Sequence, residues 1–411
     1  MFDSHRVRTV PAFIFLPLLF ILLLASCTEE RQRSVLDFDI RNPVTSGSRF
    51  PMLHTEDGET LHMSWLSGIE EGIYALEYAR MTGGRWDEQQ TVRVGSDFFV
   101  NWADFPSIVT WEQEPVALHW LKQIEGSPHA YDIQIAFREE DSNRWTHITP
   151  HRDGTATEHG FVSMMPLDRD RVLAIWLDGR EDSGSVALRS AIIHRDGTIE
   201  QEQVIDNRVC ECCQTDMVAV DGGAVAVYRN RTEDEVRDIS LVRYDSHSGS
   251  WSEPVTVHDD GWRIEGCPVN GPRLASDGEG RLAVTWFTSA DEEQRVLTAL
   301  SDDGGTTFSE PIRLDSGAAI GRVDVVSTED HGFYASWMEQ ESDFGSVYLR
   351  RFDSDGLQSE PVRVGRTDAD RNSGFPRLAA MNNGVVVAWT QTVPVMRIRT
   401  ARLPYDWEPA P

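Results

Sequence analysis

The sequence contains almost no lysine and no run of basic residues. Its 411 residues include 67 Asp and Glu against 38 Lys and Arg, for a formal net charge of −29, and Lys122 is the only lysine. A chain this acidic repels phosphate backbones, so we expect no nucleic-acid partner. A sustained 3.6-residue apolar period is also missing, which argues against long helices. What the sequence does have, 13 Trp and 31 Gly spread along the chain, argues against disorder.

The first 27 residues have the layout of an export signal. A short basic head precedes an apolar run over 11–25 that is too short for a comfortable membrane span. The run ends in Leu-Ala-Ser-Cys27, which resembles the bacterial lipoprotein signal, where cleavage before the Cys leaves it lipidated. We therefore expect a signal peptide over 1–26, a lipidated Cys27 and a tether over 27–33; an ordinary signal peptide is the alternative. The mature protein would be exported and anchored in the bacterial cell envelope, at the outer membrane, through this lipid alone.

Seven segments share a strand pattern that ends in an aromatic residue. These aromatic residues are Trp65, Trp120, Trp176, Tyr228, Trp286, Trp337 and Trp389. A repeat of about 50 residues with strand chemistry is typical of a β-propeller, with one blade per repeat.

Each repeat contains four short strand segments, named A to D here in chain order. In the fifth repeat the segments are 272–276, 282–287, 296–300 and 310–314. The seventh repeat has A, B and C but no D, and the alternating segment Ser34–Ile40 can supply it, which would close the ring and remove its open edge. We predict an all-β propeller of seven four-stranded blades over 34–411, a single domain acting as a monomer. Six blades plus an atypical module is the alternative.

The turn after strand C of the fifth repeat carries a clear motif. It reads Ser301-Asp-Asp-Gly-Gly-Thr-Thr-Phe308 and resembles the Asp-box of the sialidase-like (BNR-repeat) propellers. The chemistry suits a turn, because Asp303 can accept backbone amides and Gly305 can take a positive φ. The resemblance covers 34–411 and implies a fold rather than an activity, since Asp-boxes lie on the face opposite the sialidase active site.

Activity of this family would imply an exo-α-sialidase that acts on anionic glycans. The resemblance implies three arginines that clamp a sugar carboxylate, a Tyr activated by a Glu, and an Asp as acid/base. Asp104 precedes the second A strand, near where a sialidase acid would stand, and Tyr228 takes the B-strand position that Trp holds elsewhere. The candidate carboxylate ligands are Arg180, Arg229, Arg231, Arg273 and Arg322. Each residue could equally serve packing, so a hydrolase and a binding-only protein both remain open.

Four cysteines follow the expected signal, and they fall in two adjacent loops. Cys210, Cys212 and Cys213 precede the fourth A strand, and Cys267 precedes the fifth. Because both are D-to-A loops of neighbouring blades, we expect all four on one face near the axis. Two disulfides are the simplest interpretation for an exported protein. A copper(I) or zinc site and redox chemistry are the alternatives.

Two functions are compatible with these features. The first is a glycan-directed propeller, either hydrolytic or binding-only, with an anionic glycan as partner. The second is a non-catalytic envelope module whose cysteine face holds copper, zinc or a partner protein. The B-to-C loops that contain Arg180, Arg229 and Arg231 should face the same end as the cysteines. We therefore predict one pocket at the axis mouth, between blades three, four and five, where arginines receive an anionic group.

Overall fold

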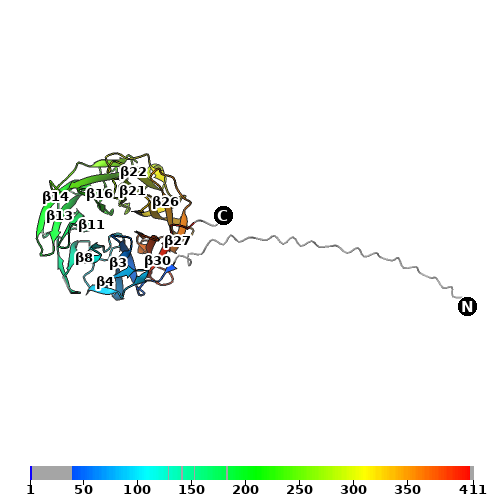
Figure 1. Ribbon diagram of the computed structural model, residues 1–411, viewed down its shortest axis with the longest axis horizontal. Coiled ribbons are helices and arrows are strands. Elements are labelled where there is room, and N and C mark those ends of the chain that lie inside the picture. The colour runs from blue at the N-terminus through cyan, green and yellow to red at the C-terminus, as the bar shows by residue number, and fades with distance from the viewer. Residues whose placement is uncertain (2–38, 128, 140–141, 152, 182–183, 408–411) are drawn as a thin grey trace. The chain divides into compact units, whose positions relative to one another are not determined.

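The computed structural model describes Met1 and residues 39–127, 129–139, 142–151, 153–181 and 184–407. The expected signal peptide, Cys27 and the tether lie outside the described residues. Figure 1 looks onto a ring of seven antiparallel sheets, with the first and last blades side by side. The predicted seven-bladed propeller is therefore confirmed, and the alternative with six blades is not needed.

Blades one to four follow one another along the chain. Blade one is β2 (Ser48–His54), β3 (Thr60–Glu70), β4 (Ile73–Thr82), β5 (Arg85–Trp86) and β6 (Gln90–Gly95). Blade two is β7 (Ile108–Trp111), β8 (Glu114–Gln123), β9 (Tyr131–Arg138) and β10 (Trp145–Ile148). Blade three is β11 (His159–Pro166), β12 (Arg171–Asp178), β13 (Val186–His194) and β14 (Ile199–Val209). Blade four is β15 (Asp216–Val220), β16 (Gly223–Arg229), β17 (Ile239–Asp245), β18 (Ser250–Trp251) and β19 (Val255–His258).

Blades five to seven complete the ring. Blade five is β20 (Arg273–Ser276), β21 (Leu282–Thr288), β22 (Arg295–Ser301) and β23 (Ile312–Arg313). Blade six is β24 (Ala319–Ser327), β25 (Phe333–Glu341), β26 (Phe344–Phe352) and β27 (Val362–Thr367). Blade seven is β28 (Arg377–Met381), β29 (Gly384–Gln391), β30 (Arg397–Leu403) and β1 (Asp39–Ile40). Among the described residues, two single 3-10 turns lie in the loops, at Ala290–Glu292 and Arg371–Ser373.

The aromatic residue that marks each repeat lies on the B strand and packs between neighbouring blades. Trp65, Trp176, Trp286 and Trp337 are among the largest fully buried side chains. Each of these four indole N–H groups donates to a carboxylate at 2.6–3.0 Å; the acceptors are Glu77, Asp178, Asp260 and Glu339. Burial of an indole contributes a large apolar area, and the carboxylate satisfies the N–H that burial would otherwise leave without a partner. The aromatic residue that recurs in the sequence thus marks the recurring unit of the hydrophobic core.

The ring is closed by the amino-terminal strand, as predicted. β1 pairs antiparallel with β30, with Asp39 opposite Ala401 and Ile40 opposite Thr400. The Asn42 side chain extends the join by donating to the Ile398 carbonyl and the Thr400 hydroxyl, both at 3.1 Å. The pairing covers the outer edge of β30 with backbone from the other end of the chain. Residues 34–38 of the predicted strand lie outside the described residues.

The predicted Asp-box is a turn between β22 and β23 that is held mainly by its own bonds. Asp303 Oδ1 accepts the backbone N–H groups of Thr306 and Thr307 at 2.8 and 2.9 Å, and Gly305 takes a φ of 82°. The Ser301 hydroxyl accepts the Gly305 N–H at 2.7 Å. Among the described residues, no helix is long and apolar enough to cross a membrane.

Candidate functional site

The ring has two faces with different content. The D-to-A and B-to-C connections lie at one end of the axis, here called the loop face, and the A-to-B and C-to-D turns lie at the other, the turn face. Antiparallel strands that run alternately up and down each blade dictate this division. The predicted cysteines and most of the predicted arginines belong to the loop face.

On the loop face the axis is closed by residues 101–105, here called the axis plug. The Trp102 ring stacks on Phe375 of blade seven at 5.7 Å, and the Arg322 guanidinium of blade six lies 4.9 Å from the Trp102 ring centre. The Ala103 carbonyl accepts a 2.6 Å hydrogen bond from Gln214 Nε2, which comes from the loop before blade four. The plug thus contacts blades on opposite sides of the ring. Side chains of the first D-to-A loop therefore lie at the axis mouth, where the sequence predicted a pocket between blades three, four and five.

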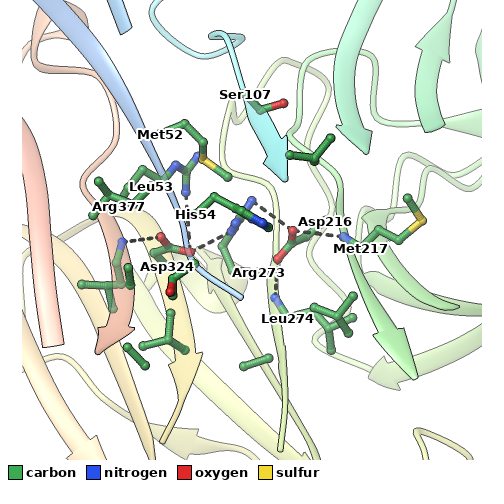
Figure 2. A pocket seen from close by; sticks show the side chains of 18 of the residues that line it. Met52, Leu53, His54, Ser107, Asp216, Met217, Arg273, Leu274, Asp324 and Arg377 are labelled. Atoms are coloured by element: carbon green, nitrogen blue, oxygen red, sulfur yellow. Dashed lines mark hydrogen bonds and ion pairs between the residues drawn. The ribbon is translucent and has the colours of Figure 1, made fainter. Parts of the chain in front are cut away.

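Beneath the plug a cavity of about 790 Å³ follows the axis. All seven A strands line it, and it extends to the A-to-B turns, where Asp57, Asp277, Glu329 and Asn382 contribute. Figure 2 shows the charged part of its wall, a chain of alternating acids and arginines from four successive blades. The cavity therefore belongs to the interior and the turn face of the ring rather than to the cysteine loops.

Arg273 is the centre of that charged chain. Its Nη1 lies 3.2 Å from Asp216 Oδ1, and its Nε donates to Asp324 Oδ1 at 2.9 Å (Figure 2). Each of the two carboxylates also accepts the backbone N–H of the next A strand, from Leu274 and Leu378, both at 2.8 Å. Arg273 therefore joins blades four, five and six, and its charge is matched by protein carboxylates.

Two other predicted ligand residues, Arg229 and Arg322, are buried and bind backbone carbonyls. Arg229 donates to the carbonyls of Asn270, Arg237 and Phe287 at 2.6–3.0 Å. Arg322 donates to the Ser373 hydroxyl at 2.5 Å and to the Gly374 carbonyl at 3.0 Å. Burial lowers the pKa of Arg322 to about 10. Both arginines hold loops of neighbouring blades together.

Arg180 and Arg231 are engaged by carboxylates. Arg180 makes a two-pronged pair with Asp178, at 2.9 and 2.6 Å, and also contacts Glu202 at 2.7 Å. Arg231 pairs with Glu235 at 2.8 Å and with Glu211 at 3.4 Å. Thus each of the five arginines predicted to receive an anion already has partners within the chain. The sequence could not show this, because most of those partners lie in other loops.

The two predicted catalytic residues are buried, and neither belongs to a Tyr–Glu pair. Tyr228 is 1% exposed and its hydroxyl donates to Asp206 Oδ2 at 2.7 Å. Burial raises its pKa, and the Asp206 charge adds to that effect. Asp104 belongs to the plug, where its Oδ2 accepts the Phe161 N–H at 2.6 Å, and burial raises its pKa to about 7. In the described residues the predicted sialidase groups are thus not assembled around a common opening.

The four cysteines, by contrast, do come together, and we call them the cysteine cluster. Cys210 Sγ lies 2.7 Å from Cys213 Sγ and 3.9 Å from Cys212 Sγ. Cys267, from the next loop, interacts with Cys212, and this interaction lowers the pKa of Cys267. All four are free, so the disulfides that the sequence favoured are absent among the described residues. These separations exceed the 2.03–2.05 Å of an S–S bond.

Local backbone pairing explains why the loops converge. The N–H of Cys210 donates to the Arg229 carbonyl at 3.0 Å, so the end of β14 continues along the end of β16. The Gly271 N–H donates to Gln214 Oε1 at 2.9 Å, and this bond ties the loop of Cys267 to the loop of the other three. A Cβ on Gly271 would lie 2.0 Å from the Gln214 carbonyl oxygen, so only glycine permits this approach.

A buried arginine that the sequence analysis did not single out lies under the cluster. Arg237 is 1% exposed, and its Nη1 donates to Cys210 Sγ at 3.4 Å and to Glu211 Oε2 at 3.0 Å. Burial opposes ionisation of Cys210, but the thiols of Cys212 and Cys213 and the charge of Arg229 outweigh it, and the pKa of Cys210 falls. The environment thus stabilises one thiolate, at Cys210, while interaction with Cys210 raises the pKa of Cys212 and burial raises the pKa of Cys213.

A second group of titratable side chains lies between blades two and three. The His151 and His159 rings stack at 3.7 Å, and both nitrogen edges approach Asp153 Oδ2 at 3.3–3.4 Å. However, His151 Nε2 accepts the Ile133 N–H at 3.1 Å, so its proton resides on Nδ1, the atom that faces Asp153. A histidine in that tautomer directs the Nδ1 proton toward the carboxylate, so this nitrogen is not a metal ligand.

No protein-family model and no curated protein matches the chain. Solved structures match over most of its length. An ulvan lyase of polysaccharide lyase family PL25, bound to a GlcA-containing saccharide, is 11% identical, with 89% of this chain and 94% of that chain covered and a TM-score of 0.52. An ancestral GH74 enzyme is 13% identical with a TM-score of 0.53, and 89% of this chain aligns with 49% of it. These carbohydrate-active enzymes share the propeller fold, and nothing in the likeness is specific to sialidases.

Proposed function

We propose that this protein binds a thiophilic metal ion, copper(I) in preference to zinc, in its cysteine cluster. The observation that carries the proposal is the convergence of four free thiols from two loops. Cys210, Cys212 and Cys213 each offer a sulfur within 4.8 Å of the others. Thiolates are the ligands that select copper(I), zinc and iron–sulfur clusters.

The arrangement favours three ligands over four. Structural zinc sites are almost always tetrahedral and closed by four ligands, whereas Cys267 stands outside the group of three. An ion with metal–sulfur bonds of about 2.3 Å sets sulfur atoms roughly 4 Å apart. The Cys210–Cys212 separation of 3.9 Å fits that edge, and the shorter Cys210–Cys213 edge would widen on binding. Arg237 and Arg229 would balance the charge of the thiolates.

The location follows from the amino-terminal signal. We propose that Cys27 is lipidated and holds the propeller at the cell envelope. Replacing Cys27 with Ser should release the protein from membranes, while retention of the variant in the membrane fraction would overturn the assignment.

Copper loading of the full chain tests the function. Protein purified in detergent under anaerobic conditions and equilibrated with copper(I) should retain about one ion per chain after desalting, by elemental analysis. The double variant Cys210→Ser, Cys213→Ser should retain none, and Cys27→Ser should retain as much as the wild type. Equal retention by the double variant, or preferential retention of zinc from an equimolar mixture, would contradict the proposal.

A glycan remains the second candidate function, because the axial cavity has the size of a small-ligand site. Its 790 Å³ and its mostly apolar wall, with a few hydroxyl, carboxylate and guanidinium groups, suit a small ligand such as a sugar residue, and the similar folds include enzymes that act on glycans. Filling the cavity with Ala380→Trp should abolish binding of uronate-containing oligosaccharides in calorimetric titrations and leave copper retention unchanged. Absence of heat from the wild type with such saccharides would remove this candidate.

A further inference from the structure

The four cysteines differ in how far they reach toward solvent. Cys210 and Cys213 are 1% and 2% exposed, Cys212 is partly exposed, and Cys267 is exposed. Cys267 interacts with Cys212, and Cys212 Sγ lies 3.9 Å from Cys210 Sγ within the group of three. Solvent exposure of the thiols therefore falls from Cys267 through Cys212 to the buried Cys210 and Cys213.

Cys267 lies on an arch that has few backbone hydrogen bonds between its ends. On one side the Ile264 N–H donates to the Glu235 carbonyl at 3.0 Å. On the other side the Asn270 side chain donates to the Ile320 carbonyl at 3.2 Å. Between these anchors, no backbone N–H of residues 265–269 donates to a backbone carbonyl of the described residues, and the arch is held by Val269, which packs against the core. The exposed thiol thus stands on a segment with few backbone constraints.

Glu211 contacts both the exposed thiol and the buried side of the cysteine cluster. Its Oε1 lies 4.0 Å from Cys267 Sγ, and its Oε2 accepts from Arg237 beneath the cluster. A carboxylate at the outer thiol attracts a cation, and the buried arginine beyond it stabilises thiolates at the inner end. From Cys267 inward, solvent exposure therefore falls while the neighbouring charge changes from the Glu211 carboxylate to the Arg237 guanidinium.

We infer that Cys267 is the entry ligand of the cysteine cluster, and that it receives copper(I) from a donor that holds the ion on thiolates. This inference rests on the proposed function. In the exchange a copper–sulfur bond to the donor breaks as a bond to Cys267 forms, and the donor sulfur takes up the proton that Cys267 releases. Copper stays in the +1 state throughout. The ion then passes through Cys212 to Cys210 and Cys213.

Transfer kinetics separate an entry ligand from a final one. A residue on the path but outside the final coordination changes the loading and release rates together and leaves their ratio unchanged. With copper(I)–glutathione as donor, Cys267→Ser in the full chain should load about tenfold more slowly than the wild type. Its equilibrium affinity, measured by competition with bicinchoninate, should stay within about threefold. Cys213→Ser should instead lose about 100-fold in affinity.

The outcomes distinguish this inference from the function on which it rests. Glu265→Gln, a change of charge on the same arch without loss of sulfur, is the matched control and should load at the wild-type rate. Wild-type loading by Cys267→Ser overturns the entry role, and so does a loss of affinity as large as that of Cys213→Ser; both leave copper binding itself intact. Failure of the wild-type chain to take copper from either reagent overturns the function and the inference together.

Discussion

The two faces of the propeller differ in how far local bonds satisfy their polar groups. On the turn face many connections carry bonds within themselves: Asp277 Oδ1 accepts the N–H groups of Glu279 and Arg281, two and four residues away. On the loop face the bonds join distant segments, as when Gln214 reaches Ala103 across 111 residues. The comparison shows why one face could be described from the sequence and the other could not. A local bond leaves a local motif, and a bond between loops leaves none.

The largest expected difference between the faces comes from their arginines. Arg229→Met would leave three buried carbonyls without a donor, so unfolding in urea should show a loss of at least about 4 kcal/mol. The matched change on the turn face is Arg243→Met, which removes bonds to the Gly304 carbonyl and the Thr306 hydroxyl at a partly exposed site. That variant should lose only about 1 kcal/mol. Similar losses for both would mean that the loop-face bonds are not the stronger constraint.

Two carboxyl groups, one on each face, have pKa values shifted in opposite directions. Burial raises the pKa of Asp104 to about 7, whereas the N–H and hydroxyl of Thr307 are chief among the bonds that lower the pKa of Asp303 to about 2. In the unfolded chain Asp104 has the ordinary aspartate pKa of 3.8, so the folded protein keeps this proton at pH values where the unfolded chain has lost it. The free energy of unfolding should therefore fall as pH rises from about 4 to 7. The contribution of Asp303 has the opposite sign and is lost only in strong acid.

Asp104→Asn isolates this effect, because the amide oxygen can still accept the Phe161 N–H. A shift of about three pKa units corresponds to about 4 kcal/mol. Denaturant titrations at pH 4 should show similar stability for variant and wild type, and at pH 8 the variant should be more stable by about that amount. A variant that is less stable than the wild type at pH 8 would show that Asp104 is ionised and paired in the fold.

The ring itself was predictable because its signals are repeated. The B-strand tryptophans and the missing seventh D strand indicated the number of blades and the closure by β1. The convergence of the cysteines followed from the same topology. The arginines were misjudged because type and position alone do not show that Arg322 is enclosed by the backbone of Gly374 or that Trp102 fills the axis mouth. Those facts depend on loop conformations that no repeat encodes.

Closure of the ring should depend on the few hydrogen bonds that join the amino-terminal segment to β30. Asn42→Ala removes the two hydrogen bonds that Asn42 donates to β30, at Ile398 and Thr400. We expect the free energy of unfolding to fall by about 1–2 kcal/mol, measured in guanidinium, with hydrogen exchange in β30 accelerated more than in β21. Uniform acceleration in all blades would instead indicate that the ring opens only by global unfolding.

The smallest effect is expected within the Asp-box turn. The buried Ser301 hydroxyl accepts the Gly305 N–H at 2.7 Å and donates to Asp303 at 2.9 Å, all within one connection. Ser301→Ala should therefore cost about 1 kcal/mol, because the neighbouring bonds from Thr306 and Thr307 to Asp303 still hold the turn. Copper retention should be unchanged, since the turn belongs to the face opposite the cysteine cluster. A loss of copper in this variant would show that the two faces are coupled. The distinction between a turn face held by local bonds and a loop face held by bonds between loops would then be wrong.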